Sequence, residues 1–255
     1  MRSARALPFL MFLVAAAVPL SGQLAPAIPY APKQSDRPEV IAADEPGFQP
    51  IFDGKTLAGW EGNTTYWRAE SGSIVGEILP STVIKSNTFI IWRGGTTGDF
   101  ELKLDYRITE GGNSGILYHV TEGAATSWHV APEMQVLDNT KHPTRDKRQL
   151  AGALYDLYAP PRDVTRGTGQ WNTARLIVQG NRVEHWLNGV KLVEYEIGSA
   201  DWQQRVANSK FQDKPEFARA TTGHICLQDH SDRVEYRNIK LRPLRTVGSD
   251  RAGGQ

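Results

Sequence analysis

The chain has 255 residues, a formal net charge of +1 and one cysteine, Cys226. Both signs of charge are interspersed along the chain, whereas a nucleic-acid-binding protein would gather basic residues in a stripe. A lone cysteine excludes an intramolecular disulfide, and therefore a small disulfide-stapled scaffold. The fold must be stabilised by a hydrophobic core, and the length is ample for one.

The N-terminal residues have the features of a secretory signal peptide. Arg2 and Arg5 precede an apolar run from Leu7 to Val18, and small residues follow. The run is too short to predict a membrane span. We predict a signal peptide at 1–25 and export to the periplasm or the extracellular space, with no membrane span in the mature chain. Residues 26–46 repeat Pro and Ala and are expected to form a flexible leader.

Short strands dominate the expected folded domain, residues 47–244, which a disordered tail follows at 245–255. The clearest strand is Asp99–Thr109, where apolar and charged residues alternate as in an antiparallel strand with one solvated face. Other strands are expected at Ser73–Ile78, Phe89–Trp92, Ser114–Val120, Glu133–Asp138, His224–Asp229 and Val234–Leu241.

A three-stranded meander and a short helix complete the pattern. Asn188-Gly189 between two apolar runs is a strong hairpin signal. Ser199 can cap a helix that reaches Ser209. Many short strands, regular turns and a single helix predict an all-β fold, a β-sandwich of the jelly-roll type. The meander strands are expected at Ala174–Gln179, Arg182–Leu187 and Val190–Glu196.

The strand that begins at Glu133 carries the first candidate site residues. Alternation places Glu133 and Gln135 on one face, opposite the apolar face of the strand. Leu137 breaks the alternation, so Asp138 joins the polar face only if a β-bulge lies between them. Such a polar face suits a sugar-processing cleft, and it equally suits the wet face of any sheet.

Five sequence blocks resemble, in order, those of a known family: IFDGKTLAGW, DFELKLDYRITEGGNSGILYH, PEMQVLDN, AGALYDLYAP and GHICLQDHSDRVEYRNIKLRPL. The family is that of the 3-keto-disaccharide hydrolases, also described as 3-keto-glucoside 1,2-lyases and 3-keto-2-hydroxy-glucal hydratases. The resemblance covers about Gly47 to Leu244 and implies a concanavalin A-like lectin/glucanase jelly roll. Two positions depart from the family: His119 replaces the usual Arg, and Cys226 replaces a small residue.

This resemblance implies an enzyme that cleaves 3-keto-glucosides or 3-keto-disaccharides. The ketone acidifies the neighbouring C2–H, so the glycosidic bond can leave by elimination, and hydration then gives net hydrolysis. The site needs a base near C2, an acid near the glycosidic oxygen, and donors or a metal for the enolate. Glu133 or a nearby His is the candidate base, with His230 ahead of His142, and Glu133 and His230 are the predicted catalytic residues.

A larger set of polar and aromatic residues is expected to bind the saccharide substrate. Asp138 and Asp229 would hold a His tautomer or bind sugar, while Tyr155 and Trp128 would stack on the ring or fill the loop. His185 and His224 alternate with apolar neighbours and are expected to be structural. The predicted substrate-binding residues are Asn113, His119, Gln135, Asp138, His142, Tyr155, Gln228 and Asp229.

No cofactor is predicted, and a divalent metal is left open. Several His and carboxylate residues could converge, but none has the tight spacing of an HExxH motif. The sequence does not define the oligomeric state.

Two other functions remain open. A retaining glucanase on the same fold uses an E-x-D-x-x-E strand, but here Gln135 replaces the central Asp, and Asp138 is shorter than Glu. A jelly roll can also bind carbohydrate without any catalysis. Turnover of unoxidised glucosides would favour the glucanase, and binding without turnover would favour the binding module.

Overall fold

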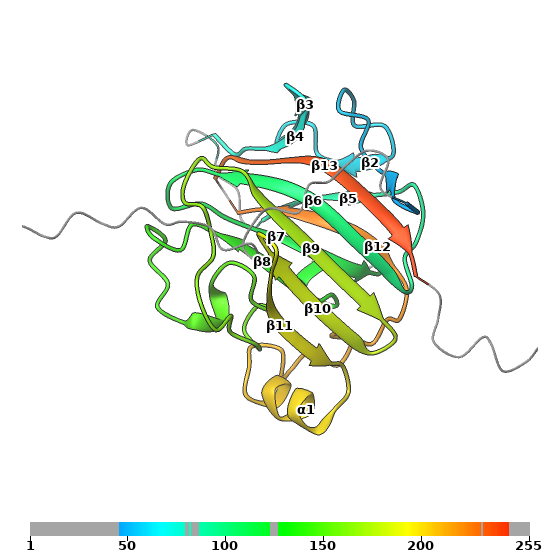
Figure 1. The fold of residues 1–255 in the computed structure, drawn as a ribbon, viewed down its shortest axis with the longest axis vertical. Coiled ribbons are helices and arrows are strands. Elements are labelled where there is room, and N and C mark those ends of the chain that lie inside the picture. The colour runs from blue at the N-terminus through cyan, green and yellow to red at the C-terminus, as the bar shows by residue number, and fades with distance from the viewer. Residues whose placement is uncertain (1–45, 80–81, 83–86, 123–126, 231, 245–255) are drawn as a thin grey trace, which may run out of the picture. The chain divides into compact units, whose positions relative to one another are not determined.

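The computed structural model describes residues 46–79, 82, 87–122, 127–230 and 232–244. These residues form two antiparallel β-sheets that pack face to face, with one short α-helix beside them (Figure 1). The expected signal peptide, most of the leader, and the tail lie outside the described residues and stay predictions. Within the described residues, no helix is long and apolar enough to cross a membrane.

The larger sheet, sheet A, has the described strand order β11-β10-β9-β6-β13-β4-β3, and β1 also pairs with β13. Its strands are β1 (Gln49–Pro50), β3 (Trp67–Glu70), β4 (Ser73–Gly76), β6 (Phe100–Ile108), β9 (Asn172–Gln179), β10 (Arg182–Leu187), β11 (Val190–Glu196) and β13 (Val234–Pro243).

The smaller sheet, sheet B, has the described order β2-β5-β12-β7-β8, so the strand that carries Glu133 lies at its edge. Its strands are β2 (Trp60–Gly62), β5 (Thr88–Trp92), β7 (Asn113–Val120), β8 (Glu133–Leu137) and β12 (His224–Asp229). Two 3-10 turns, η2 (Ser127–His129) and η3 (Lys147–Gln149), lie in loops, and the helix is α1 (Ala200–Ala207).

The two sheets confirm the predicted all-β jelly roll. The hairpin turn and the helix cap also form at the residues where the sequence predicts them. Asn188 and Gly189 have φ angles of 50° and 80° at the hairpin between β10 and β11. The Ser199 side chain accepts a hydrogen bond of 3.2 Å from the Trp202 backbone N–H and caps α1.

The core lies between the two sheets and is filled by alternate residues of their strands. Phe100 and Leu104 of β6 are fully buried there, as are Ile116 of β7 and Met134 and Val136 of β8. The residues between them along each strand therefore point away from the core.

The prediction of a solvated face on β6 is corrected, because its charged residues Glu101, Lys103 and Asp105 are buried and only Arg107 is partly exposed. Glu101 and Lys103 are only 2% and 3% exposed. The Glu101 carboxylate pairs with Arg175 and Arg242, and the Lys103 ammonium lies 5.0 Å from the centre of the Phe48 ring. Alternation of polar and apolar residues shows that one face of a strand is polar, but it does not show which other residues cover that face.

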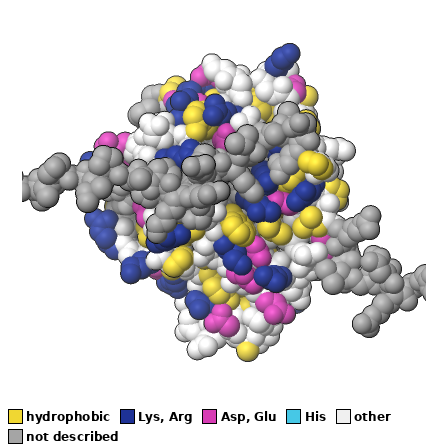
Figure 2. Space-filling view, viewed as in Figure 1, with side chains coloured by type: hydrophobic (Ala, Val, Ile, Leu, Met, Phe, Trp, Pro, Cys, Tyr) yellow, Lys and Arg dark blue, Asp and Glu magenta, His cyan; other side chains and the backbone are white. Residues whose placement is uncertain are grey.

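Figure 2 shows charged side chains of both signs interspersed on the visible surface.

A polar network crosses the core between the sheets, and it confirms the structural role expected for His185. The Tyr195 hydroxyl lies 2.6 Å from the Tyr118 hydroxyl and 3.0 Å from His185 Nε2. Burial lowers the pKa of His185 to about 4, so the imidazole is neutral.

We expect Tyr195→Phe to lower the free energy of unfolding by about 1–3 kcal/mol, because it leaves Tyr118 and His185 with an unmet buried hydrogen bond. Tyr158→Phe is the matched control, since the Tyr158 hydroxyl bonds the exposed Asp201 and its loss should change stability by roughly 0.5 kcal/mol or less. Urea unfolding measures both variants. Equal stability of the two variants would contradict the importance of the network.

Candidate active site

A cavity of about 290 Å³ opens on the face of sheet B that points away from sheet A. Sheet B, four of the loops next to its strands and the segment after α1 contribute to its wall. It brings together six of the predicted site residues, from segments far apart in the sequence. The lining residues are Asn87, Phe89, Asn113, Trp128, Glu133, Gln135, Tyr155, Lys210, Gln228 and His230.

Two side chains of β8 form the polar floor of the cavity, as alternation predicts. Glu133 and Gln135 are only 5% and 2% exposed, so the face is dry rather than wet. The loop after β8 folds back along this edge strand, where Gln135 N–H donates to the Ala153 carbonyl and Tyr155 N–H donates to the Glu133 carbonyl, each at 3.0 Å. This pairing covers the strand edge and brings Tyr155 to the cavity.

The Glu133 carboxylate lies over a glycine of the neighbouring strand. A Cβ atom at Gly115 would come within 1.9 Å of Glu133 Oε1, so no other residue fits beneath the carboxylate. Gln228 of β12 donates a hydrogen bond of 3.2 Å to the same oxygen. The close packing of β7 and β12 therefore fixes the place of this carboxylate.

Burial sets the electrostatics of Glu133. Loss of water disfavours its charged form and raises its pKa to about 7, while the positive charge of Lys210 partly opposes that rise. A carboxyl group that titrates near neutral pH can accept or donate a proton there, which is the property expected of a catalytic acid or base.

Lys210 is a lining residue that the sequence analysis missed. Its ammonium lies 3.8 Å from the centre of the Tyr155 ring and 4.4 Å from that of Trp128, in cation–π contact with both. Burial lowers the pKa of Lys210, and the charge of Glu133 opposes this shift. The wall thus holds a carboxyl and an ammonium that influence each other.

Gln135 leaves an acceptor free for a ligand. Its amide nitrogen donates a hydrogen bond of 3.1 Å to Asn113 Oδ1, but its buried Oε1 has no hydrogen-bond partner among the residues that the structure describes. An unpartnered buried carbonyl costs free energy unless a donor satisfies it. A sugar hydroxyl in the cavity would supply that donor, which agrees with the predicted binding role of Gln135 and Asn113.

Of the two candidate histidines, His230 lines the cavity and His142 does not. His230 follows β12, is exposed and lines the cavity at its outer part. His142 does not line the cavity, and its Nδ1 accepts a hydrogen bond of 3.2 Å from the Thr144 N–H. Its pKa is lowered chiefly by burial, with Asp232 opposing the shift and His230 adding to it. His230 therefore remains the better-placed histidine.

His119 does not join the site, which corrects its expected substrate contact. A register shift in the pairing of β7 with β12 falls at this point, and His119 has a φ angle of 55°. The bulge turns its ring against Phe100 and Tyr118, with Nε2 at 2.9 Å from the Gly98 carbonyl. Asp138 was expected on the polar face of β8 only if a bulge followed Leu137, but the register of β7 with β8 is regular as far as Leu137, where β8 ends.

Asp138 and Asp229 also point away from the cavity. The Asp138 carboxylate accepts hydrogen bonds from the Gly111 N–H at 2.8 Å and from Thr140, so it ties together the two loops beside β7 and β8. Asp229 is fully buried, and its Oδ1 accepts a hydrogen bond of 3.2 Å from the Asp232 N–H. Both carboxylates therefore accept hydrogen bonds from backbone N–H groups of turns near the site, and the turn bonded by Asp229 follows the strand end next to His230.

Two further features that the sequence analysis singled out are the cysteine Cys226 and a possible metal site. Cys226 packs with Leu117, Val120 and Ala131 on the outer face of sheet B, as expected for a packing variant. Among the described residues, no group of three or more His, Cys, Asp or Glu side chains is arranged to hold a metal ion.

Some lining residues had no usable signal in the sequence. Asn87 and Phe89 lie at the start of β5, but polar or apolar residues at a strand end are common. Lys210 lies in a polar loop after α1 and reaches the site only through tertiary packing. Trp128 was noticed as an aromatic that could stack on a sugar, and the structure places it beside Lys210.

Fold and cavity together define a jelly-roll domain with a buried carboxyl at a concave polar site, an architecture suited to carbohydrate binding and chemistry. The chain belongs to the family of the 3-keto-alpha-glucoside-1,2-lyase-like domain, whose model matches residues 47–242. This membership supports a carbohydrate-active enzyme.

Individual relatives agree with the family. A 3-keto-disaccharide hydrolase of Bacteroides thetaiotaomicron is 30% identical over 242 residues, which cover 80% of this chain and 81% of that protein. A crystal structure from Parabacteroides distasonis, described as a glycosyl hydrolase, has a TM-score of 0.71 and 32% identity, covering 78% of this chain and 94% of that one. A second structure from that organism, with a TM-score of 0.60 and 24% identity over 77% and 99% of the two chains, shares the fold.

We expect Gly115→Ala to displace the Glu133 carboxylate, because the added methyl occupies its position. Overpacking of this kind costs roughly 1–3 kcal/mol of stability. Gly98→Ala is the matched control, since a Cβ there meets its nearest neighbour at an ordinary 3.6 Å. A crystal structure and urea unfolding of each variant measure the effects. An unmoved carboxylate in Gly115→Ala would refute the role of this glycine.

Proposed function

We propose that the protein is an exported enzyme that cleaves the glycosidic bond of 3-keto-glucosides or 3-keto-disaccharides by elimination, followed by hydration. One observation carries the proposal. Among the described residues that line the cavity, Glu133 is the sole carboxyl group, it is buried, and it lies in the same wall as Lys210. The family and the named relative supply the substrate class.

Glu133 is the proposed base. Its carboxylate accepts the C2 proton of the sugar, and the electrons of the broken C–H bond form the C2=C3 double bond of an enolate. The negative charge then resides on the oxygen at C3. A pKa of about 7 matches this base to neutral pH, where it is partly ionised and still basic enough to take the proton.

Lys210 is the proposed stabiliser of that enolate. Lys210 shares the cavity wall with Glu133, and its ammonium lies against the rings of Tyr155 and Trp128. A positive charge held in place beside the developing negative charge stabilises it more strongly than a mobile ion in bulk water does. The ammonium would lie near the oxygen at C3, where the charge develops.

His230 is the proposed acid for the leaving group. As the enolate restores the C3=O bond, a C1=C2 double bond forms and the bond from C1 to the glycosidic oxygen breaks. His230, at the exposed part of the wall, donates a proton to that oxygen. Water then adds its hydroxyl to C1 while a proton returns to C2, which gives the free 3-keto sugar.

The two competing functions are less well supported by the cavity. A glucanase needs two carboxyl groups on the two sides of the bond, whereas Asp138 points away from Glu133 and bonds Gly111 and Thr140. A binding module would use the free Gln135 acceptor, but it has no need of a buried carboxyl with a raised pKa.

We expect Glu133→Gln to lower kcat/KM on 3-keto-trehalose by about 10²–10⁴-fold, the usual contribution of a general base. Substrate binding should persist, because the amide keeps the shape of the side chain. In the wild type, kcat/KM should fall as the pH drops below about 7, since protonated Glu133 cannot accept the C2 proton. Initial rates from pH 5 to 9 and calorimetric binding measure these effects.

Glu196→Gln, an exposed site at the end of β11, is the matched control and should retain wild-type rates. Every assay is run with and without a chelator and added divalent cations, which tests the metal that the sequence leaves open. Full activity in Glu133→Gln would refute the base. Binding of 3-keto sugars without any turnover by the wild type would establish the binding module instead.

A further inference from the structure

The loop that carries Lys210 is anchored on both sides of this residue. Ser209 Oγ donates a hydrogen bond of 2.9 Å to the Val206 carbonyl and accepts one of 3.1 Å from the Phe211 N–H. The Phe211 ring stacks on Phe217 at 3.8 Å between centroids. These contacts fix the backbone around Lys210 against the end of α1.

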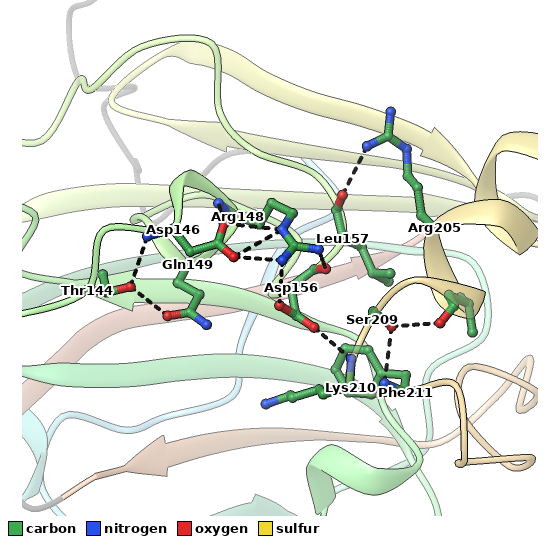
Figure 3. Close-up of polar contacts among 11 residues, drawn as sticks. Thr144, Asp146, Arg148, Gln149, Asp156, Leu157, Arg205, Ser209, Lys210 and Phe211 are labelled. Atoms are coloured by element: carbon green, nitrogen blue, oxygen red, sulfur yellow. Dashed lines mark hydrogen bonds and ion pairs between the residues drawn. The ribbon is translucent and has the colours of Figure 1, made fainter.

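Asp156 binds the backbone of Lys210 directly. Asp156 Oδ2 accepts a hydrogen bond of 2.8 Å from the Lys210 N–H, and Oδ1 lies 3.4 Å from Arg148 Nη2 (Figure 3). Arg148 Nη1 also donates a hydrogen bond of 3.1 Å to the Asp156 carbonyl. The Arg148 backbone carbonyl accepts one of 2.9 Å from the Asp156 N–H. Asp156 is 7% exposed and does not line the cavity.

The backbone of Asp156 adopts a left-handed conformation, which Asp tolerates better than most residues do. Its φ angle is 62°, in the left-handed region that residues with a Cβ seldom occupy. The contacts with Arg148 on one side and Lys210 on the other hold it there. Strained backbone that the surroundings fix in this way is often found near functional sites.

Tyr155, the residue before Asp156, contacts the side chain of the lysine whose backbone Asp156 binds. The Tyr155 ring contacts the Lys210 ammonium at 3.8 Å, while the Asp156 carboxylate holds the Lys210 N–H. The Tyr155 N–H donates to the Glu133 carbonyl. Residues 155 and 156 therefore connect the proposed base to both ends of Lys210.

Charged groups from several elements face Lys210. Glu133 of β8 and Asp156 favour its charged form and oppose the effect of burial on its pKa. Tyr155 has its pKa raised to about 12 by burial, with Glu133 and Asp156 adding to the shift, so it stays neutral. On the outer side, the positive charges of Lys214 and Lys210 help to lower the pKa of His129.

We propose that Asp156 is a positioning residue that fixes both the place and the charge environment of Lys210 in the cavity wall. The inference deepens the proposed function and rests on it only for its catalytic consequence. Asp156 does not line the cavity, so a sugar bound there would not contact it. It acts through Lys210, and Arg148 holds it in place.

Asp156→Asn tests the proposal, because the amide oxygen can keep the hydrogen bond to the Lys210 N–H while the charge is lost. We expect kcat to fall about tenfold at pH 8 with KM nearly unchanged, because Lys210 loses part of the positive charge that would stabilise the enolate. Asp201→Asn is the matched control, since Asp201 pairs with Arg205 and Tyr158 and has no contact with Lys210. It should keep the wild-type kcat.

A second measurement does not depend on activity. NMR titration of ¹³C-labelled lysine, with Lys210 assigned by Lys210→Arg, should show a lower pKa for Lys210 in Asp156→Asn than in the wild type. If the wild type turns over no 3-keto glycoside but this pKa falls, the positioning inference stands and the proposed function fails. An unchanged Lys210 titration and an unchanged kcat in a folded Asp156→Asn would overturn the inference.

Discussion

The burial of one carboxyl group, that of Glu133, is the constraint on which the site depends. Taking a carboxylate out of water is costly, so a buried one must be neutral or be compensated by nearby donors and positive charge. Here the glycine at 115 makes room beneath it, Gln228 donates a hydrogen bond, and Lys210 lies in the same wall. The result is a carboxyl poised between its two protonation states at neutral pH.

The strands of sheet B and the loops around them each contribute part of this site. Strands of sheet B place Glu133, Gln135 and Gln228 with little freedom, because each is fixed by its register with a neighbour. Loops then enclose the site: the segment after β8 pairs with the strand edge and brings Tyr155, and the segment after α1 brings Lys210. The strands supply the Glu133 carboxyl, and the packed loops supply the Lys210 ammonium.

The sequence predicts those features that depend on local chemistry. The Asn188-Gly189 hairpin and the Ser199 cap need only neighbouring residues, and alternation correctly puts Glu133 and Gln135 on one face. Predictions failed where distant segments decide the outcome. The charges of β6 are covered by side chains from elsewhere, and Lys210 reaches Glu133 only through folding of the whole domain. His119 was misplaced because a bulge in β7 reverses the direction of its side chain.

The central claim is that Glu133 removes the proton from C2, and hydrogen exchange at that carbon tests it most directly. The wild-type enzyme would cleave unlabelled 3-keto-trehalose in D₂O, with the product followed by NMR at early times and the isolated product incubated alone to correct for spontaneous exchange. The account predicts deuterium at C2 of the released 3-keto-glucose at the first measurable turnover, and loss of this incorporation in Glu133→Gln. Cleavage by the wild type that leaves the original hydrogen at C2 would contradict it.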